Sequence, residues 1–302
     1  MTVRRFPTSV HIREVGPRDG LQNESTFVPT KDKIEWINQL SSSGLNYIEV
    51  TSFVNPKWIP ALSDAEIVAK GIQKAPNVTY AALVPNMRGL IRALDSPIDE
   101  VSVFLSASES HNKKNINKTI RETEVVLAEV TREAIANHKS VRGYLSTVFG
   151  CPFEGKVDIN EVIRLTDSLF EMGIEELSLG DTIGVANPVH VQIVLEALLK
   201  RYPQEKIAMH FHNTRGTAMA NVLASLEMGI TKFDSSLGGL GGCPYAPGAS
   251  GNLATDDLHY MLTSMGIQTN IQTDKLHSAA LFIQDKMNKP LDSYTVKYGM
   301  KD

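Results

Sequence analysis

Two histidines that lie two positions apart carry the clearest chemical signal in the sequence. His210 and His212 belong to the stretch IAMHFHN (207–213), whose apolar residues are typical of a buried strand. Successive strand side chains point to opposite faces, so both imidazoles share one face while Met209 and Phe211 share the other. A single buried histidine is more often a satisfied core residue, but two on one face are costly to bury without partners. The pair therefore favours ligation of a metal.

Further polar residues lie where other strands are expected to end. Arg18 and Asp19 follow the first strand in GPRDGLQNE, and Glu49 lies late in the second strand. Asp19 precedes a glycine, as turn residues often do, and Arg18 could instead form a surface ion pair. Glu49 stands between Ile48 and Val50, where a carboxylate needs a paired partner. Arg18 is the obvious partner.

The second half of the chain adds three residues with open alternatives. Asp181 ends the sixth strand, where it could act in catalysis or only cap the turn GDTIG. The glycine- and proline-rich stretch GGLGGCPYAPGASGN (238–252) predicts a mobile loop over the strand ends. Its central Cys243 favours chemistry over packing, although an incidental thiol is the simpler alternative. Asn252 could donate an oxygen ligand or could be the N-cap of the next helix.

Short β-rich runs alternate with helical patterns along the whole chain. The stretch KDKIEWINQLSSSG has apolar residues at helical spacing, and Pro188 and Pro203 bracket another predicted helix with Asn187 as its N-cap. A further helix over 273–289 is expected to pack outside the main body. Eight strands are predicted, over residues 10–15, 47–53, 79–84, 100–108, 141–149, 176–184, 207–213 and 232–241.

Eight strands separated by crossovers, with no linker between them, indicate an α/β fold, a (β/α)8 TIM barrel with an additional C-terminal helix. A doubly wound sheet is the alternative, but it usually has fewer strands. A barrel of this kind commonly reaches this length as a single domain, so residues 1–302 are expected to form one catalytic domain. Closure of the barrel would place the first strand beside the eighth. Asp19 would then lie near His210 and His212, giving three ligands for a divalent cation.

Composition narrows the classes of protein and partner. The chain has 302 residues, of which 42% are hydrophobic and 21% charged, as in ordinary globular proteins. Its formal net charge of -4 offers no electrostatic footprint for nucleic acid or an anionic membrane. No apolar stretch resembles a signal peptide or a membrane span. Its two cysteines, Cys151 and Cys243, fit a reducing compartment, so we expect a cytoplasmic protein.

Five long motifs resemble those of 3-hydroxy-3-methylglutaryl-CoA lyases, within a wider superfamily of metal-dependent barrels. They are EVGPRDGLQNE, IEVTSFVNPKWIP, SLGDTIGVANP, HFHNTRG and GLGGCPYAPGASGNLATDDL, in that order along the chain. The resemblance runs from about Val10 to about Ile271. The first and fourth motifs are shared across the superfamily, whereas the cysteine loop narrows the likeness to the lyases.

This resemblance implies both an activity and a set of residue roles. The activity is cleavage of 3-hydroxy-3-methylglutaryl-CoA to acetyl-CoA and acetoacetate, a retro-Claisen reaction. The implied cofactor is a divalent cation, Mg²⁺ or Mn²⁺ before Zn²⁺ or Co²⁺, and the implied partners are an acyl-CoA substrate and a second copy of the chain. The implied metal ligands are Asp19, His210, His212 and Asn252, and the implied catalytic residues are Arg18, which contacts the acyl carbonyl, Cys243 as the thiol, and the supporting Glu49 and Asp181.

Two positions depart from the family pattern, and other functions stay open. Asn213 stands where many relatives have aspartate after the paired histidines, and Asp256 stands where some have glutamate. Neither is an implied ligand, so the departures concern hydrogen bonds around the site.

The alternatives to this lyase activity are a Claisen-type acyl-CoA synthase, a related hydroxyacyl-CoA or ketoacid lyase, a non-haem iron oxygenase, and a barrel that binds metal or CoA without catalysis.

Overall fold

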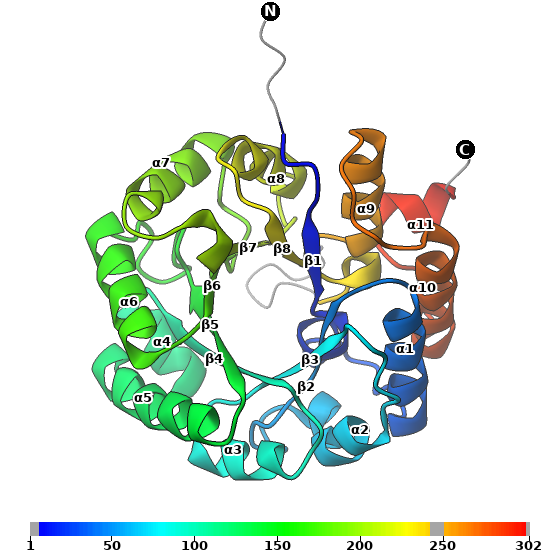
Figure 1. Cartoon of the computed structure of the whole chain (residues 1–302), viewed down its shortest axis with the longest axis horizontal. Helices are drawn as coiled ribbons and strands as arrows, with labels where there is room; N and C mark the ends of the chain where they lie inside the picture. Colours follow the sequence, from blue (N-terminus) through cyan, green and yellow to red (C-terminus); the bar gives the residue numbers. More distant parts are fainter. Residues whose placement is uncertain (1–5, 242–250, 300–302) are drawn as a thin grey trace, which may run out of the picture.

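All eight predicted strands form, and they close into one parallel barrel with helices outside it (Figure 1). The structure, a computed structural model, describes residues 6–241 and 251–299. Closure occurs where β1 pairs with β8, in a register that places Glu14 opposite Ser235. The strands are β1 (His11–Glu14), β2 (Tyr47–Ser52), β3 (Thr79–Leu83), β4 (Glu100–Ser106), β5 (Ser140–Ser146), β6 (Glu176–Asp181), β7 (Ile207–Phe211) and β8 (Lys232–Ser235).

The eighth strand is shorter than the sequence pattern predicted. It ends at Ser235, whereas the prediction extended to Gly241. Gly238 and Gly239 both have a φ of +70°, which a strand cannot accommodate, so the ladder stops before them. The chain therefore leaves the barrel earlier than predicted, directly after Ser235.

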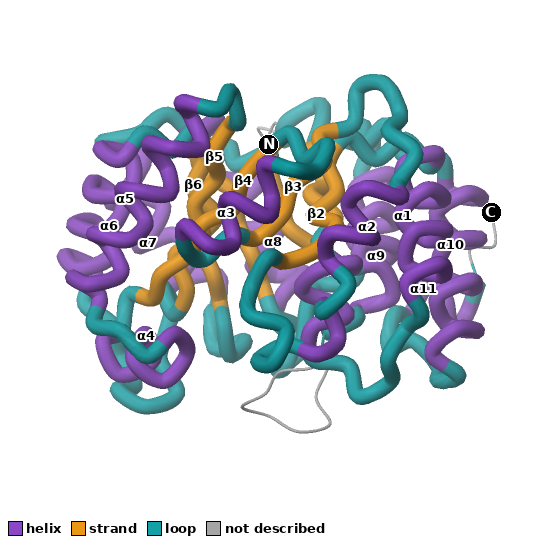
Figure 2. Tube along the Cα trace, turned by 90° about the horizontal axis from the view of Figure 1, so that it is seen from below, coloured by secondary structure: helices purple, strands orange, loops and turns teal. Residues whose placement is uncertain are grey.

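Helices follow the strands around the barrel, as the apolar spacing predicted (Figure 2). Asn187 caps α7 as expected, since its side chain accepts the N–H of His190 and Pro188 occupies the first helical position. The helices are α1 (Thr30–Ser42), α2 (Ala65–Gly71), α3 (Met87–Leu94), α4 (Glu109–Ile116), α5 (Ile120–Ala136), α6 (Ile159–Met172), α7 (Pro188–Leu199), α8 (Ala218–Glu227), α9 (Thr255–Ser264), α10 (Thr273–Met287) and α11 (Tyr294–Tyr298).

The predicted additional C-terminal helix is α10, and a short α11 follows it. In Figure 1 both lie outside the ring, on the side of β1 and α1. α10 packs against α1, with Leu276, Ala279, Ala280 and Ile283 on its buried face. No helix in the described ranges is long and apolar enough to cross a membrane.

The interior of the barrel is polar and charged, which distinguishes it from the branched aliphatic filling usual in this fold. Arg142 on β5 donates to Asp234 on β8 at 2.6 Å and to Glu176 on β6 at 2.7 Å. Tyr144, also on β5, donates its hydroxyl to Glu49 on β2 at 3.2 Å. Because β5 neighbours neither β8 nor β2, two of these contacts must cross the barrel.

We predict that Arg142→Met lowers the free energy of unfolding by about 3–5 kcal/mol, because Asp234 would stay buried without a cation. Urea denaturation followed by circular dichroism measures this change. The matched control is Arg201→Met, whose ion pair with Asp167 lies on the surface and contributes little. Equal denaturation midpoints for the two variants would contradict a structural role for the buried pair.

Candidate metal centre

The turn after β1 brings a carboxylate to the two histidines of β7. Residues Gly16–Gly20 form a single π-helical turn, in which the carbonyl oxygen of Val15 accepts the N–H of Gly20 at 3.3 Å as well as that of Asp19 at 2.7 Å. Such turns are frequent at functional sites. Asp19, His210 and His212 present ligand atoms that all lie within 4.8 Å of one another. The predicted juxtaposition of the first and seventh strands is thus present in the structure.

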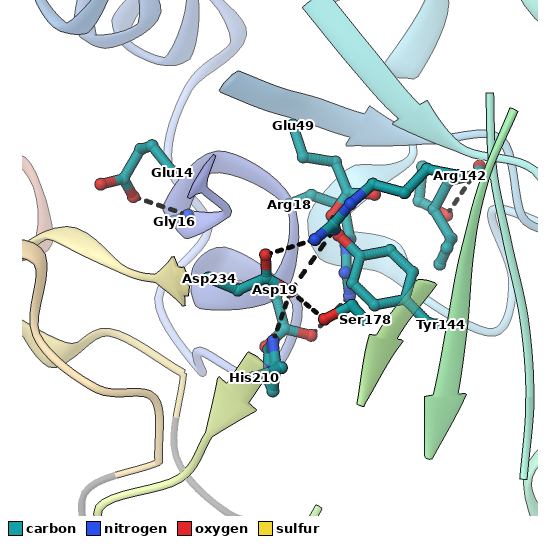
Figure 3. A network of polar contacts seen from close by, with 12 residues as sticks. Glu14, Gly16, Arg18, Asp19, Glu49, Arg142, Tyr144, Ser178, His210 and Asp234 are labelled. Atoms are coloured by element: carbon teal, nitrogen blue, oxygen red, sulfur yellow. Dashed lines mark hydrogen bonds and ion pairs between the residues drawn. The ribbon is translucent and has the colours of Figure 1, made fainter. Parts of the chain in front are cut away.

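A second carboxylate fixes the orientation of His210. Nδ1 of His210 lies 3.3 Å from Oδ2 of Asp234, so its other ring nitrogen, Nε2, faces Asp19 at 3.9 Å (Figure 3). Asp234 is itself held by Arg142 and by the Ser178 hydroxyl, which donates to it at 2.7 Å. This arrangement, in which a carboxylate orients an imidazole, is the one that surrounds most metal-binding histidines.

The charges of the cluster follow from burial and from the neighbouring groups. Burial, together with the nearby His210, lowers the pKa of His212 to about 4, so this imidazole is neutral at pH 7. Burial alone would raise the pKa of Asp19, but the Arg18 guanidinium and the two histidines hold it below its usual value. For His210, burial is outweighed by the hydrogen bond to Asp234 and by Asp19, which raise its pKa.

Asn252 joins the cluster and is not a helix cap. Helix α9 begins at Thr255 with Ala254 in the N-cap position, so the capping alternative is wrong. The Asn252 amide nitrogen donates to Oδ2 of Asp19 at 2.8 Å and to the carbonyl oxygen of Leu240 at 3.0 Å. A Cβ on Gly241 would lie 2.7 Å from this nitrogen, so only glycine leaves room for the carboxamide at that position.

Arg18 pairs with Glu49, as expected, and also with its sequence neighbour. Its Nε donates to Glu49 at 2.6 Å and its Nη1 donates to Asp19 at 2.5 Å. In the part of the chain that the structure describes, no hydrogen bond engages Nη2. The side chain is buried, and its guanidinium lies 5.3 Å from the centroid of the Tyr144 ring. A fixed cation with one free edge therefore stands beside the cluster.

The two remaining predicted residues are Asp181, which is not among the three converging ligands, and Cys243. The Asp181 carboxylate accepts the N–H groups of Val185 and Ala186 at 2.8 and 3.2 Å, which closes the turn after β6. Burial raises the pKa of Asp181 to about 6. Cys243 lies outside the described residues. Cys151 is buried, and its sulfur accepts the N–H groups of Phe153 and Glu154 at 3.3 and 3.4 Å.

Sequence reasoning missed the polar residues inside the barrel. Arg142, Tyr144, Ser178 and Asp234 surround the cluster (Figure 3), yet none was among the predicted site residues. The argument that identified Glu49, a charge within an apolar strand, applies equally to Arg142 in SVRGYLS and to Asp234 in KFDS. A charge within a predicted strand could therefore have identified Arg142 and Asp234, whereas Tyr144 and Ser178 carry no such signal.

The cluster fits a divalent cation. In the described ranges, Nδ1 of His212 and Oδ1 of Asn252 are buried without a hydrogen-bond partner, although such atoms are normally satisfied. Together with Asp19 and His210 they provide a mixed set of nitrogen and oxygen donors, which suits Mg²⁺, Mn²⁺ and similar ions. The fold and these donors define the class as a metal-dependent (β/α)8-barrel enzyme.

Comparison with known proteins gives the family. The profile of the HMGL-like family matches residues 9–283. Hydroxymethylglutaryl-CoA lyase YngG of Bacillus subtilis (strain 168) is 62% identical over 288 residues, which cover 95% of this chain and 96% of that protein. The chain belongs to the HMGL-like family.

Solved structures agree with this assignment. The crystal structure of the Bacillus subtilis HMG-CoA lyase has a TM-score of 0.96 at 61% identity, covering 97% of this chain and 98% of that one. An HMG-CoA lyase from Acinetobacter baumannii, in complex with coenzyme A and 3-methylmalate, has a TM-score of 0.94 at 42% identity. It covers 100% of this chain and 98% of its own. The predicted TIM barrel and the predicted family are confirmed.

One of the two departures from the family pattern supplies a pH test. Asp256 is buried, and its carboxylate accepts the N–H of Gly238 and the hydroxyl of Ser293. Burial, reinforced by Asp257, raises its pKa to about 6, whereas an unfolded aspartate titrates near about 4. Between these values the unfolded chain has lost the proton and the folded chain keeps it, so stability falls as the pH rises.

We therefore predict that Asp256→Asn removes this slope. Relative to the unchanged protein, the variant gains about 3 kcal/mol of unfolding free energy between pH 4 and 6, with no further gain above pH 6. Urea denaturation of both proteins across this range measures the difference. Parallel stability curves would show that Asp256 does not titrate in this window.

Proposed function

We propose that this protein cleaves 3-hydroxy-3-methylglutaryl-CoA to acetyl-CoA and acetoacetate at the cluster of Asp19, His210, His212 and Asn252. The activity follows from the 62% identity to a hydroxymethylglutaryl-CoA lyase over 95% of the chain. The protein is thus a carbon–carbon lyase. The convergence of the two histidines and Asp19 is the structural observation that supports placing the reaction at this cluster. We further propose that the whole chain forms one catalytic domain.

The substrate is an acyl-CoA thioester. The relative from Acinetobacter baumannii was crystallised with coenzyme A and 3-methylmalate, and its similarity covers the entire chain. In barrels of this type the substrate lies over the carboxyl ends of the strands, where Asp19, His210 and Asn252 are found here. The acyl group would therefore approach the cluster from the carboxyl ends of the strands, the side on which the chain leaves β8.

The reaction begins with loss of the proton from the tertiary hydroxyl group of the substrate. A divalent cation bound at the cluster supplies Lewis acidity, which lowers the pKa of an alcohol that it polarises. Asp19 or His210 would accept the proton, because both lie at the cluster, through an oxygen or nitrogen atom that does not bind the cation. Asp234 keeps His210 in the orientation that this role requires, because it holds the opposite ring nitrogen.

Arg18 stabilises the charge that develops as the carbon–carbon bond breaks. The electron pair of that bond passes to the departing acetyl-CoA fragment, which becomes an enolate with negative charge on its thioester oxygen. Glu49 and Asp19 fix two of the three guanidinium nitrogens, which directs Nη2 toward a substrate oxygen. A positive group held in place before the reaction stabilises such charge without reorganisation.

The last step is protonation of the enolate carbon, which we assign to Cys243. In the sequence, the thiol lies in the glycine-rich segment between the end of β8 and Asn252.

We also propose Mg²⁺ or Mn²⁺ as the cation, a homodimer as the assembly and the cytoplasm as the location. The mixed set of nitrogen and oxygen donors suits these two ions. The net charge of -4 fits a protein without a nucleic-acid partner.

An assay of acetoacetate release tests the proposed reaction and its cofactor together. We expect turnover of 3-hydroxy-3-methylglutaryl-CoA to stop with a chelator and to return when Mg²⁺ or Mn²⁺ is added. His212→Ala should not recover at the same concentrations, because it removes one of three converging ligands. His277→Ala on the outer helix α10 is the matched control and should behave as the unchanged protein does. Full turnover after exhaustive demetallation would refute the metal-dependent mechanism.

Substitution of the thiol separates protonation from metal binding. Cys243→Ala should lower kcat by roughly 10²–10⁴-fold, the usual loss when a positioned proton donor is removed. Titration with Mn²⁺, followed by electron paramagnetic resonance, should give an unchanged Kd. Near-normal turnover in this variant would exclude Cys243 from the mechanism.

A further inference from the structure

One buried carboxylate that the mechanism does not use connects three segments of the site. Glu14, at the end of β1, is fully buried. Its Oε1 accepts the N–H of Gly16 at 2.8 Å and the N–H of Leu237 at 3.0 Å. Its Oε2 accepts the hydroxyl of Thr255 at 2.6 Å. Figure 3 shows Glu14 and Gly16 beside the turn that carries Arg18.

Each of the three donors belongs to a segment that delivers part of the site. Gly16 begins the turn that holds Arg18 and Asp19. Leu237 begins the segment after β8, which leads to the glycine-rich stretch. Thr255 lies three residues after Asn252, at the start of α9. No other single side chain of the described residues receives hydrogen bonds from all three.

The three hydrogen bonds are the main compensation for burying this group. In the described part of the chain, no arginine, lysine or histidine forms an ion pair with Glu14. A buried carboxylate without a cation is costly unless neutral donors satisfy it, so losing any donor carries a large penalty. The segments are therefore held to Glu14 by the need to satisfy its oxygens, and each is held at a fixed distance from the other two.

The close packing around Glu14 supports the same conclusion. A Cβ added to Gly16 would lie 2.5 Å from Oε1 of Glu14 and 3.1 Å from the Ser236 hydroxyl. Only a glycine allows the turn to approach the carboxylate this closely. Thr255 is held on its other side by the Ser235 hydroxyl, at 2.7 Å.

We propose that Glu14 is a positioning residue, which sets the separation between the turn bearing Arg18 and Asp19 and the segment bearing Asn252. This inference rests on the proposed function, because it gives a purpose to the alignment of those residues. Glu14 acts through the backbone of the turn, through Leu237 and through Thr255, and its hydrogen bonds in the described residues include none to a proposed ligand atom.

The test compares two substitutions at Glu14. Glu14→Ala should raise the Kd for Mn²⁺ about tenfold or more and lower kcat about 10²-fold, the cost of misplacing reacting groups by about 1 Å. KM should change little, because a positioning residue acts on the alignment of the reacting groups and not on uniform binding of the substrate. Glu14→Gln keeps Oε1 for both backbone N–H groups, and Thr255 can turn its hydroxyl to accept from the new amide. We therefore expect Glu14→Gln to restore kcat and Kd to within about threefold of the unchanged protein.

A variant at Thr255 keeps the test decisive if Glu14→Ala does not fold, and a double variant tests the shared contact if it does. Thr255→Val removes one of the three hydrogen bonds with little change of shape, so it should raise the Kd for Mn²⁺ by a smaller factor. The double variant Glu14→Ala with Thr255→Val should be no worse than Glu14→Ala alone, because both changes break the same contact. The control is Glu100→Ala, which removes a half-buried carboxylate held by the Tyr47 and Ser140 hydroxyls at the other end of the barrel. It should lower thermal stability and leave the Kd unchanged.

The proposal is overturned if a folded Glu14→Ala binds Mn²⁺ and turns over as the unchanged protein does. It is also overturned if Glu14→Gln loses as much as Glu14→Ala, or if Thr255→Val leaves the Kd unaltered. Failure of the unchanged protein to cleave the thioester would instead refute the proposed function. In that case the Kd for Mn²⁺ still decides whether Glu14 positions the cluster.

Discussion

The pairing of β1 with β8 is the contact on which the site depends. Arg18 and Asp19 stand near the start of the chain and the two histidines stand about 190 residues later, so only ring closure brings them together. The register of β1 on β8, with Glu14 opposite Ser235, sets how far the turn after β1 projects beyond the strand ends. Because β7 pairs with β8 on the other side, only β8 lies between His210 and that turn in the ring.

The polar residues inside the barrel also orient the site through contacts between residues that are far apart in the sequence. Arg142 crosses the barrel to Asp234, and Asp234 in turn holds His210. Burial would raise the pKa of Asp234, but Arg142 lowers it, so a carboxylate and not a carboxylic acid faces the imidazole. An aliphatic filling would give more hydrophobic stabilisation, yet it could not fix the tautomer of a histidine above it. The charged interior therefore stabilises the fold less than an aliphatic interior would, and in return it orients the side chains of the site.

Sequence reasoning succeeded where the signal is local and failed where it depends on contacts across the barrel. The alternation of strand side chains placed His210 and His212 on one face, and strand order alone placed Asp19 beside them. The partners of Asp234 could not be predicted in the same way, because β5 and β8 are not neighbours and no periodicity relates their registers. The role of Asn252 was ambiguous because it stands only three positions before the true start of α9, close enough for a helix cap.

The turn after β1 shows how two neighbouring residues can serve different partners. In a π-helical turn, Arg18 and Asp19 leave the backbone in different directions, so one points along the barrel interior to Glu49 and the other toward the histidines. Their own ion pair couples the two directions, since a shift of Asp19 must move the guanidinium with it. The Asp19 carboxylate, which would hold the metal ion, and the Arg18 guanidinium, which would hold an enolate oxygen, are thereby kept at a fixed separation. For a reaction in which negative charge passes from an alkoxide to an enolate, that separation must match the distance between the two oxygens of the substrate.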